Sequence, residues 1–222
     1  MEYHGPEPTD LANVCALNIA FLDWLRARGG SGAATHPRTP EILPALAGMS
    51  ARQLERLSRA PFLLMSFREY DESQWRSLFA GRPDTDLFHS LEKPDEEAAR
   101  LITAGLGFLW QLSKRNPYAA RLVSGAGLNW CEQLADCTLV ELFTRAVSGR
   151  SLLEPRLIEN PDLWQKLLNA GVSAKRDVRR AARVSALQTV LTHSSTGSYR
   201  HLAAAACNMP AVAVRVAGRT SR

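Results

Sequence analysis

The sequence lacks the long hydrophobic runs of a membrane protein and the cysteine spacing of a disulfide or zinc framework. No stretch of about 18 or more apolar residues is free of charge, and residues 1–10 are acidic and proline-rich rather than basic and apolar. We therefore expect neither a membrane span nor a secretory signal. The absence of a C-x-x-C pair favours reduced, mostly buried thiols in a cytoplasmic protein over a zinc site. The cysteines are Cys15, Cys131, Cys137 and Cys207.

Sequence motifs of catalysis are also missing. The chain contains no G-x-S-x-G, no H-E-x-x-H, no phosphate-binding G-x-x-x-x-G-K-S/T and no G-x-G-x-x-G. The acidic run at residues 95–97 is expected in the first turn of a helix, where carboxylates complement the helix dipole. The histidines fall in expected loops or near the C-terminus, without metal-ligand spacing; they are His4, His36, His89, His193 and His201. We expect a non-enzymatic protein with no cofactor and no metal site.

The positive charge is concentrated at one end of the chain. Residues 174–222 contain nine Lys or Arg and one acid, a net charge of +8. The other 18 basic and 21 acidic residues give −3, so the total of +5 belongs to the C-terminal segment. Such asymmetry favours nucleic acid or an acidic protein as a partner of this segment.

Three sequence anchors recur in the same order after 87, 88 and 89 residues. Small loop insertions explain the drift, and a repeat of this kind predicts a duplicated unit. The paired anchors are Phe21–Leu25 with Phe108–Leu112, Leu46–Ser50 with Leu134–Thr138, and Trp75 and Leu78 with Trp164 and Leu167. We predict an all-α fold of two homologous helical units in tandem, packed as a pseudo-dimer. The units span residues 9–90 and 91–172, and a basic helix and flexible tail occupy residues 173–222.

Local signals place the helices within these units. Apolar residues at helical spacing predict long helices over residues 11–25 and 95–114. Ser50–Gln53 and Thr138–Glu141 are capping boxes, each of which opens a short helix. The segments 61–67 and 150–155 are expected to be buried connections, and the pattern leaves open whether they are strands or helical turns.

The basic C-terminal segment contains the candidate binding residues. A basic helix is expected from Gly171 to about Thr192. Its arginines at 176, 179, 180 and 183 are three and four residues apart and therefore share a face that can lie against phosphates. A solvated basic face, or ion pairs with the acidic body, is the structural alternative. The candidate nucleic-acid-binding residues are Lys175, Arg176, Arg179, Arg180 and Arg183. Tryptophans at apolar helical positions are assigned to packing, with base stacking as the alternative.

Three segments of residues 10–80 form a further pattern: Leu17–Leu22, Leu46–Leu57 around the first capping box, and Ser66–Asp71 with its Phe-Arg pair. In these segments the chain resembles the FlhD family of flagellar transcriptional co-activators. The second unit is similar mainly over Leu134–Ala146. Met65 occupies the position of the family's cysteine, family members are about half as long, and the basic tail has no counterpart in them.

The resemblance implies an all-α regulatory subunit that dimerises and pairs with a zinc-bearing, DNA-binding partner. The first functional hypothesis is an FlhD-like transcriptional co-regulator of motility or secretion genes, acting through protein contacts and with DNA contact by the tail. The alternative is a non-enzymatic adaptor of a type III secretion or flagellar apparatus, because Leu153–Leu168 resembles small accessory proteins of secretion sorting platforms. The partners considered are a protein, DNA and a second copy of the chain.

Overall fold

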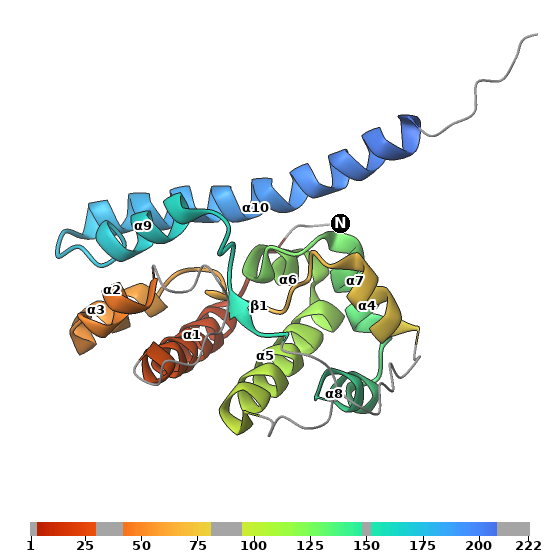
Figure 1. Cartoon of the computed structure of the whole chain (residues 1–222), viewed down its shortest axis with the longest axis horizontal. Helices are drawn as coiled ribbons and strands as arrows, with labels where there is room; N and C mark the ends of the chain where they lie inside the picture. The colour runs from red at the N-terminus through yellow and green to blue at the C-terminus, as the bar shows by residue number, and fades with distance from the viewer. Residues whose placement is uncertain (1–3, 30–41, 81–94, 148–151, 208–222) are drawn as a thin grey trace, which may run out of the picture.

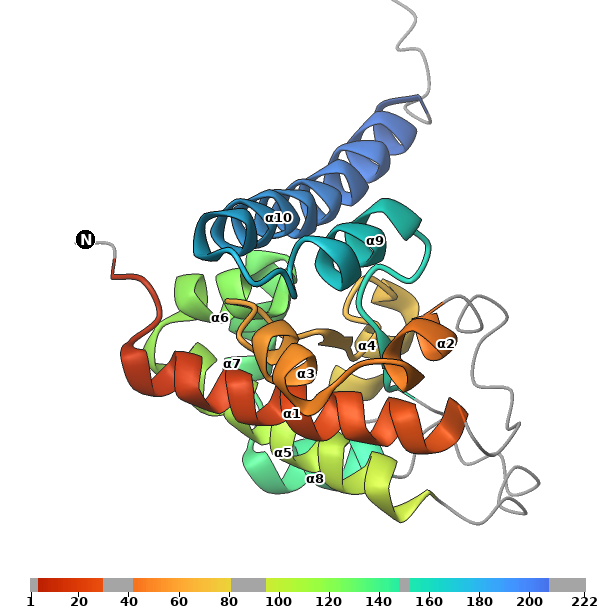
Figure 2. The ribbon, with the colours of Figure 1, turned by 90° about the vertical axis from the view of Figure 1, so that its left-hand side faces the viewer.

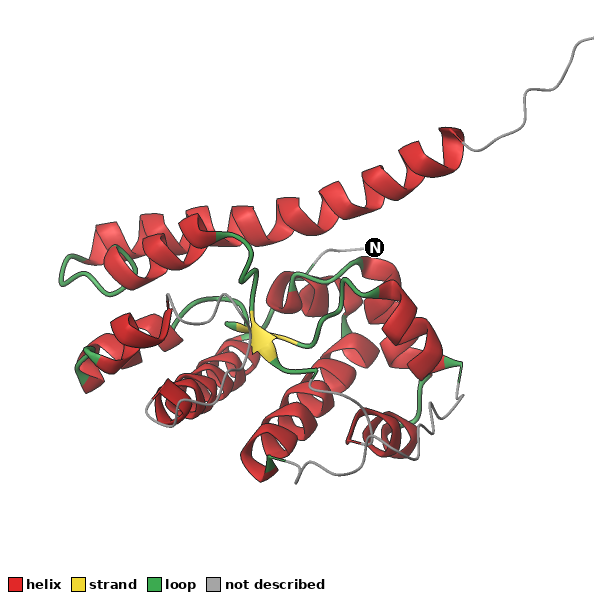
Figure 3. Cartoon of the chain, viewed as in Figure 1, coloured by secondary structure: helices red, strands yellow, loops and turns green. Residues whose placement is uncertain are grey.

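The computed structural model describes residues 4–29, 42–80, 95–147 and 152–207, with the backbone alone for 144–147, 161 and 194–207. This part of the chain is mostly helical, so the expected all-α class is confirmed (Figure 3). The elements in chain order are α1 (Pro8–Gly29), α2 (Ile42–Ala47), α3 (Ala51–Ser58), β1 (Met65–Ser66), α4 (Glu72–Phe79), α5 (Glu96–Arg115), α6 (Pro117–Ser124), α7 (Leu128–Asp136), α8 (Leu139–Val147), β2 (Glu154–Pro155), α9 (Pro161–Asn169) and α10 (Arg176–Cys207).

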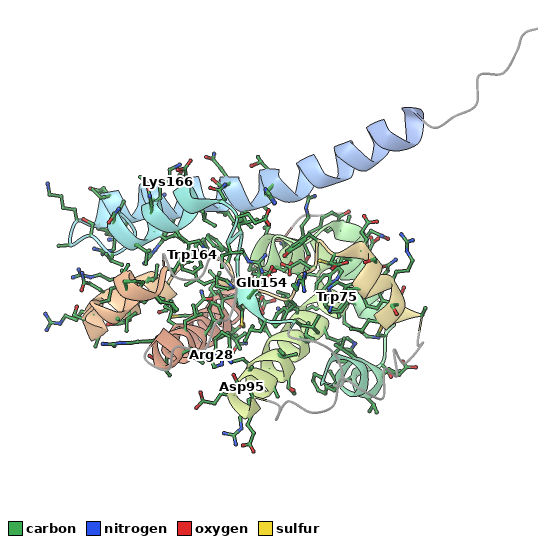
Figure 4. The ribbon with its side chains drawn as sticks, in the orientation of Figure 1. Arg28, Trp75, Asp95, Glu154, Trp164 and Lys166 are labelled. Atoms are coloured by element: carbon green, nitrogen blue, oxygen red, sulfur yellow. The ribbon has the colours of Figure 1, made fainter. Side chains whose placement is uncertain are left out.

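The helices α1 and α5, of 22 and 20 residues, form the centre of the body. They pack against each other, α1 also contacts α2 and α3, and α5 also contacts α6, α7 and α8 (Figure 1). One end of this pair is tied by Asp95, which pairs with Arg28 of α1 at 2.9 Å and accepts a hydrogen bond from the Trp24 indole at 3.1 Å (Figure 4). The same carboxylate caps α5 by accepting the backbone N–H groups of Glu97 and Ala98. A single side chain therefore begins α5 and anchors it to α1.

Both capping boxes form where the sequence places them. The Gln53 N–H donates to Ser50 Oγ at 3.4 Å, and the Ser50 N–H donates back to Gln53 Oε1 at 2.9 Å. In the same way the Glu141 N–H donates to Thr138 Oγ1 at 3.2 Å, and the Thr138 N–H donates to Glu141 Oε2 at 3.1 Å. The starts of α3 and α8 are thus set by local sequence.

Two buried connections pair with each other as short strands. Met65 lies opposite Pro155 and Ser66 lies opposite Glu154 in an antiparallel ladder, the two-stranded sheet of the described residues. The sequence left strand and helical turn open for these segments, and the structure assigns strands. All four residues are buried, as expected of the connections.

The C-terminal helix differs in extent from the expected one. It begins at Arg176, because Gly171 closes α9 with a hydrogen bond to the Lys166 carbonyl and Ser173 Oγ accepts from the Lys175 N–H before the helix starts. The helix reaches Cys207 instead of ending near Thr192, and it includes His193, which was expected near the tail. It packs along α9 and projects beyond the body (Figure 1). The expected loops that contain His36 and His89, and the part of the predicted flexible tail beyond residue 207, lie outside the described residues.

Asn18 is a fully buried polar side chain on α1. Its amide nitrogen donates to the carbonyls of Ser58 at 3.1 Å and Phe62 at 2.9 Å, and its amide oxygen accepts from the Leu64 N–H at 2.7 Å. These three bonds satisfy backbone groups that water does not reach. They attach the segment that leads into β1 to the central helix.

Replacing Asn18 with alanine should destabilise the fold by about 2–4 kcal/mol, because three buried backbone groups lose their partner. Urea unfolding followed by circular dichroism measures this change. The matched control is Asn13→Ala on the exposed side of the same helix, which should shift stability by no more than about 0.5 kcal/mol. Equal effects of the two substitutions would contradict the assigned role of Asn18.

Candidate nucleic-acid interface

A groove of about 520 Å³ lies between α3 and the first turns of α10. Figure 2 shows both helices on the face turned to the viewer. Arginine side chains from both helices line it together with three apolar residues, and we call it the arginine groove. Its lining residues are Arg56, Arg59, Pro61, Arg176, Arg179, Arg180, Arg183, Val184 and Leu187.

The structure brings four of the five predicted binding residues together. Arg176, Arg179, Arg180 and Arg183 of α10 all line the groove. Lys175 precedes α10, is exposed and is not among the lining residues.

Arg56 and Arg59 are groove residues that sequence reasoning missed. Arg56 lies in the last turn of α3 and Arg59 is the residue that caps the C-terminus of this helix, so both side chains come from the same end of α3. No sequence signal indicates that α3 lies beside α10, since the two helices are more than 100 residues apart in the chain. The juxtaposition is a property of the tertiary fold.

Backbone carbonyls hold three of these arginines in place. Arg183 Nη2 donates to the Arg56 carbonyl at 2.7 Å, and Arg56 Nη1 donates to the Val172 carbonyl at 3.1 Å. Arg179 Nη1 donates to the carbonyls of Ser173 and Ala174 at 2.7 and 2.8 Å. Each guanidinium has five N–H donors, so these bonds orient the side chains and leave further donors for an anion.

The groove has more positive than negative charge. Burial lowers the pKa of Arg183, and the neighbouring positive charges of Arg179 and Arg59 lower it further. Glu55 pairs with Arg59 at 2.6 Å, but both side chains are more than half exposed and the pair is correspondingly weak. An anion that enters the groove would therefore meet several guanidinium groups whose mutual repulsion it relieves.

The tryptophans are used for packing instead. Trp24, Trp75, Trp130 and Trp164 are buried, which leaves no exposed ring face on them for base stacking. Trp110 is partly buried, donates from its indole to the Cys137 carbonyl at 2.8 Å and has the Lys114 ammonium over its ring.

In the described part of the chain, no group of three or more His, Cys, Asp or Glu side chains is arranged to hold a metal ion. None of the described helices is long and apolar enough to cross a membrane. Comparisons with known protein families, with curated proteins and with solved structures find no match. The resemblance to the FlhD family therefore stays a prediction.

The three cysteines whose side chains are described, Cys15, Cys131 and Cys137, are reduced thiols. Cys131 is fully buried on α7, and this burial raises its pKa to about 12. The other two are partly buried, and Cys15 lies 3.3 Å from Ser58 Oγ. Burial therefore keeps the Cys131 thiol protonated well above neutral pH.

Cys131 should resist alkylation by iodoacetamide at pH 8.5 in the folded protein and react readily in urea, because the thiolate is the reactive form. A thiol exposed in the unfolded chain loses its proton near pH 8.5, whereas folded Cys131 keeps it to about pH 12. Its contribution to stability is therefore present below about pH 8.5 and falls as the pH rises above that value. Peptide mapping by mass spectrometry assigns each modified cysteine, and rapid labelling of Cys131 without denaturant would contradict the expectation.

Proposed function

We propose that this chain is a non-enzymatic transcriptional co-regulator that contacts DNA phosphates through the arginine groove. The observation that carries the proposal is the convergence of six arginines, from α3 and α10, on one concave surface. Arginine is well suited to phosphate because its planar fork of donors matches pairs of phosphate oxygens. Most hydrogen bonds between proteins and DNA go to phosphate and sugar, and such contacts position a protein without reading sequence.

We further propose that the chain is built as a single-chain counterpart of an FlhD-like dimer, with a basic C-terminal helix added. The β1–β2 ladder supports this architecture. At a repeat shift of 89 residues, Met65 corresponds to Glu154 and Ser66 corresponds to Pro155. Exchanging each residue for its counterpart therefore turns the pair Met65–Pro155 into the pair Glu154–Ser66, which is the other pair of the ladder. Such exchange of partners is the property of an isologous contact between two copies related by a two-fold axis.

The turns that follow the two strands support the same architecture. The Trp75 indole donates to the Phe67 carbonyl at 3.1 Å, and the Trp164 indole donates to the Arg156 carbonyl at 2.8 Å, each across eight residues. In Figure 4 these tryptophans lie on opposite sides of Glu154 in β2.

The backbone of these turns repeats as well. Arg68 and Leu157, again 89 residues apart, are the described non-glycine residues with positive φ, at 53° and 48°. Left-handed backbone is uncommon for such residues, so its occurrence at both positions is a specific resemblance.

Helix packing is consistent with two units as well. In the first unit α1 contacts α2 and α3, and in the second α5 contacts α7 and α8, the elements at corresponding positions. An FlhD-like subunit acts with a protein partner, and the exposed apolar Leu11 and Ile19, eight residues apart on α1, give that helix an outward apolar face. This face supports the protein-contact part of the proposal.

The chain should bind duplex DNA of about 30 base pairs with an affinity that falls about 10³-fold between 50 and 200 mM salt if six phosphates are neutralised. Fluorescence anisotropy measures this dependence. Arg176→Gln with Arg180→Gln should weaken binding and reduce the slope of log affinity against log salt by about 2, since each lost arginine releases one phosphate contact.

The matched control is the pair Arg76→Gln and Arg100→Gln, two arginines outside the groove with 80% of the side chain exposed. It should leave the salt slope of DNA binding unchanged. Absence of salt-sensitive binding, or equal loss in the control, would refute the DNA contact. In that case, stable co-purification with components of a secretion or flagellar apparatus would favour the adaptor function.

A further inference from the structure

We propose that the arginine groove is also a receptor for a small polyphosphate that carries a flat base, a ligand of the nucleoside triphosphate class. The volume of the groove is the first reason. About 520 Å³ lies within the range of roughly 300–1,000 Å³ that is typical of small-molecule sites. The ligand would span the gap between α3 and α10 and bind both helices at once.

The lining of the groove has two chemical parts. Guanidinium groups provide charged donors for several phosphates, whereas Pro61, Val184 and Leu187 provide an apolar patch beside them. Val184 is 52% exposed, so its side chain is accessible to a ligand in the groove. In duplex DNA the bases are stacked inside the helix, so the phosphate backbone offers no partner for this patch. A free nucleotide offers both a phosphate chain and a flat ring.

The groove is organised before any ligand arrives. Arg56, Arg179 and Arg183 are held by the carbonyl bonds described above, so binding does not have to immobilise three freely rotating side chains. Arg183 is also fixed against α3 by its bond to the Arg56 carbonyl. A polyphosphate would displace Glu55 from Arg59 at the exposed rim, which costs little because that ion pair is solvated.

Ligand binding follows from the groove alone, but its regulatory consequence rests on the proposed contact with DNA. The same arginines would serve both anions, so a bound nucleotide would compete with DNA. Occupancy of the groove by a nucleotide would then lower the fraction of the protein on DNA.

Isothermal titration of the full chain with ATP, inorganic triphosphate and adenosine, without magnesium, tests the proposal. ATP should bind with one site per chain, triphosphate should bind more weakly because it lacks the base, and adenosine alone should give no heat.

Arg59→Gln and Arg180→Gln change exposed side chains, and each should weaken ATP binding about tenfold through the loss of charged hydrogen bonds. Val184→Ser should weaken ATP and leave triphosphate unchanged, and Arg100→Gln should alter neither. Circular dichroism confirms that each variant is folded.

The proposal is overturned if ATP gives no saturable binding, if the groove variants bind ATP as tightly as Arg100→Gln, or if triphosphate binds as tightly as ATP. Duplex DNA provides the arm that separates this failure from failure of the proposed function. Salt-sensitive DNA binding without ATP binding would refute the receptor and leave the DNA contact intact. ATP binding without DNA binding would support the nucleotide receptor and refute the DNA contact. Displacement of DNA by ATP would support both proposals.

Discussion

The guanidinium of Arg156 connects segments of the chain that are 87 to 93 residues apart. It is buried, and it donates to the carbonyls of Leu63 and Met65, each at 2.6 Å, and to the carboxylate of Glu69. Glu69 in turn accepts from Ser66 Oγ and from the Phe67 N–H, both at 2.8 Å. A buried charge is tolerated only when its partners are complete, and removal of one partner from such a pair is strongly destabilising. The junction of β1 and β2 therefore depends on this closed network.

The position of α10, and with it the arginine groove, follows from the same centre. Gly125 ends α6 in a left-handed conformation, and a Cβ there would lie 3.3 Å from Arg156 Nη1 and 2.3 Å from Val190 Cγ1. The absence of a side chain lets Val190 of α10 approach the core beside the buried guanidinium. Ala182, Ala186 and Val190 are buried at intervals of four residues, so one stripe of α10 faces the body. The arginine face then falls beside α3.

Local chemistry made part of this structure predictable. The capping boxes at Ser50 and Thr138 and the helical spacing of the α10 arginines depend on residues only a few positions apart in the sequence. The strands β1 and β2 are only two residues long, and β2 contains Pro155, so the apolar segments around them did not specify the pairing. The sequence around Arg156 gives no sign that this side chain is buried. Its burial depends on the carbonyls of Leu63 and Met65, which lie about 90 residues earlier in the chain. For the same reason Arg56 and Arg59 could not be assigned to the groove, whose two walls come from opposite ends of the chain.

A single chain can differentiate two contacts that a symmetric dimer must keep identical. If the two units are copies, Phe67 corresponds to Arg156 and Asn18 corresponds to Gly105 at the repeat shifts of 89 and 87. Each difference has a structural role. A Cβ on Gly105 would lie 2.4 Å from the Phe67 ring, so a glycine at position 105 leaves room for that ring. Asn18, at the corresponding position of α1, instead forms hydrogen bonds to the backbone that leads into β1. The basic helix adds a larger asymmetry. It lies beside α3, while α8, which corresponds to α3 if the two units are copies, lies on the opposite side of the body (Figures 1 and 2). In that case a dimer of identical subunits would present two arginine grooves related by symmetry, whereas α10 in the described part of this chain forms such a groove with α3.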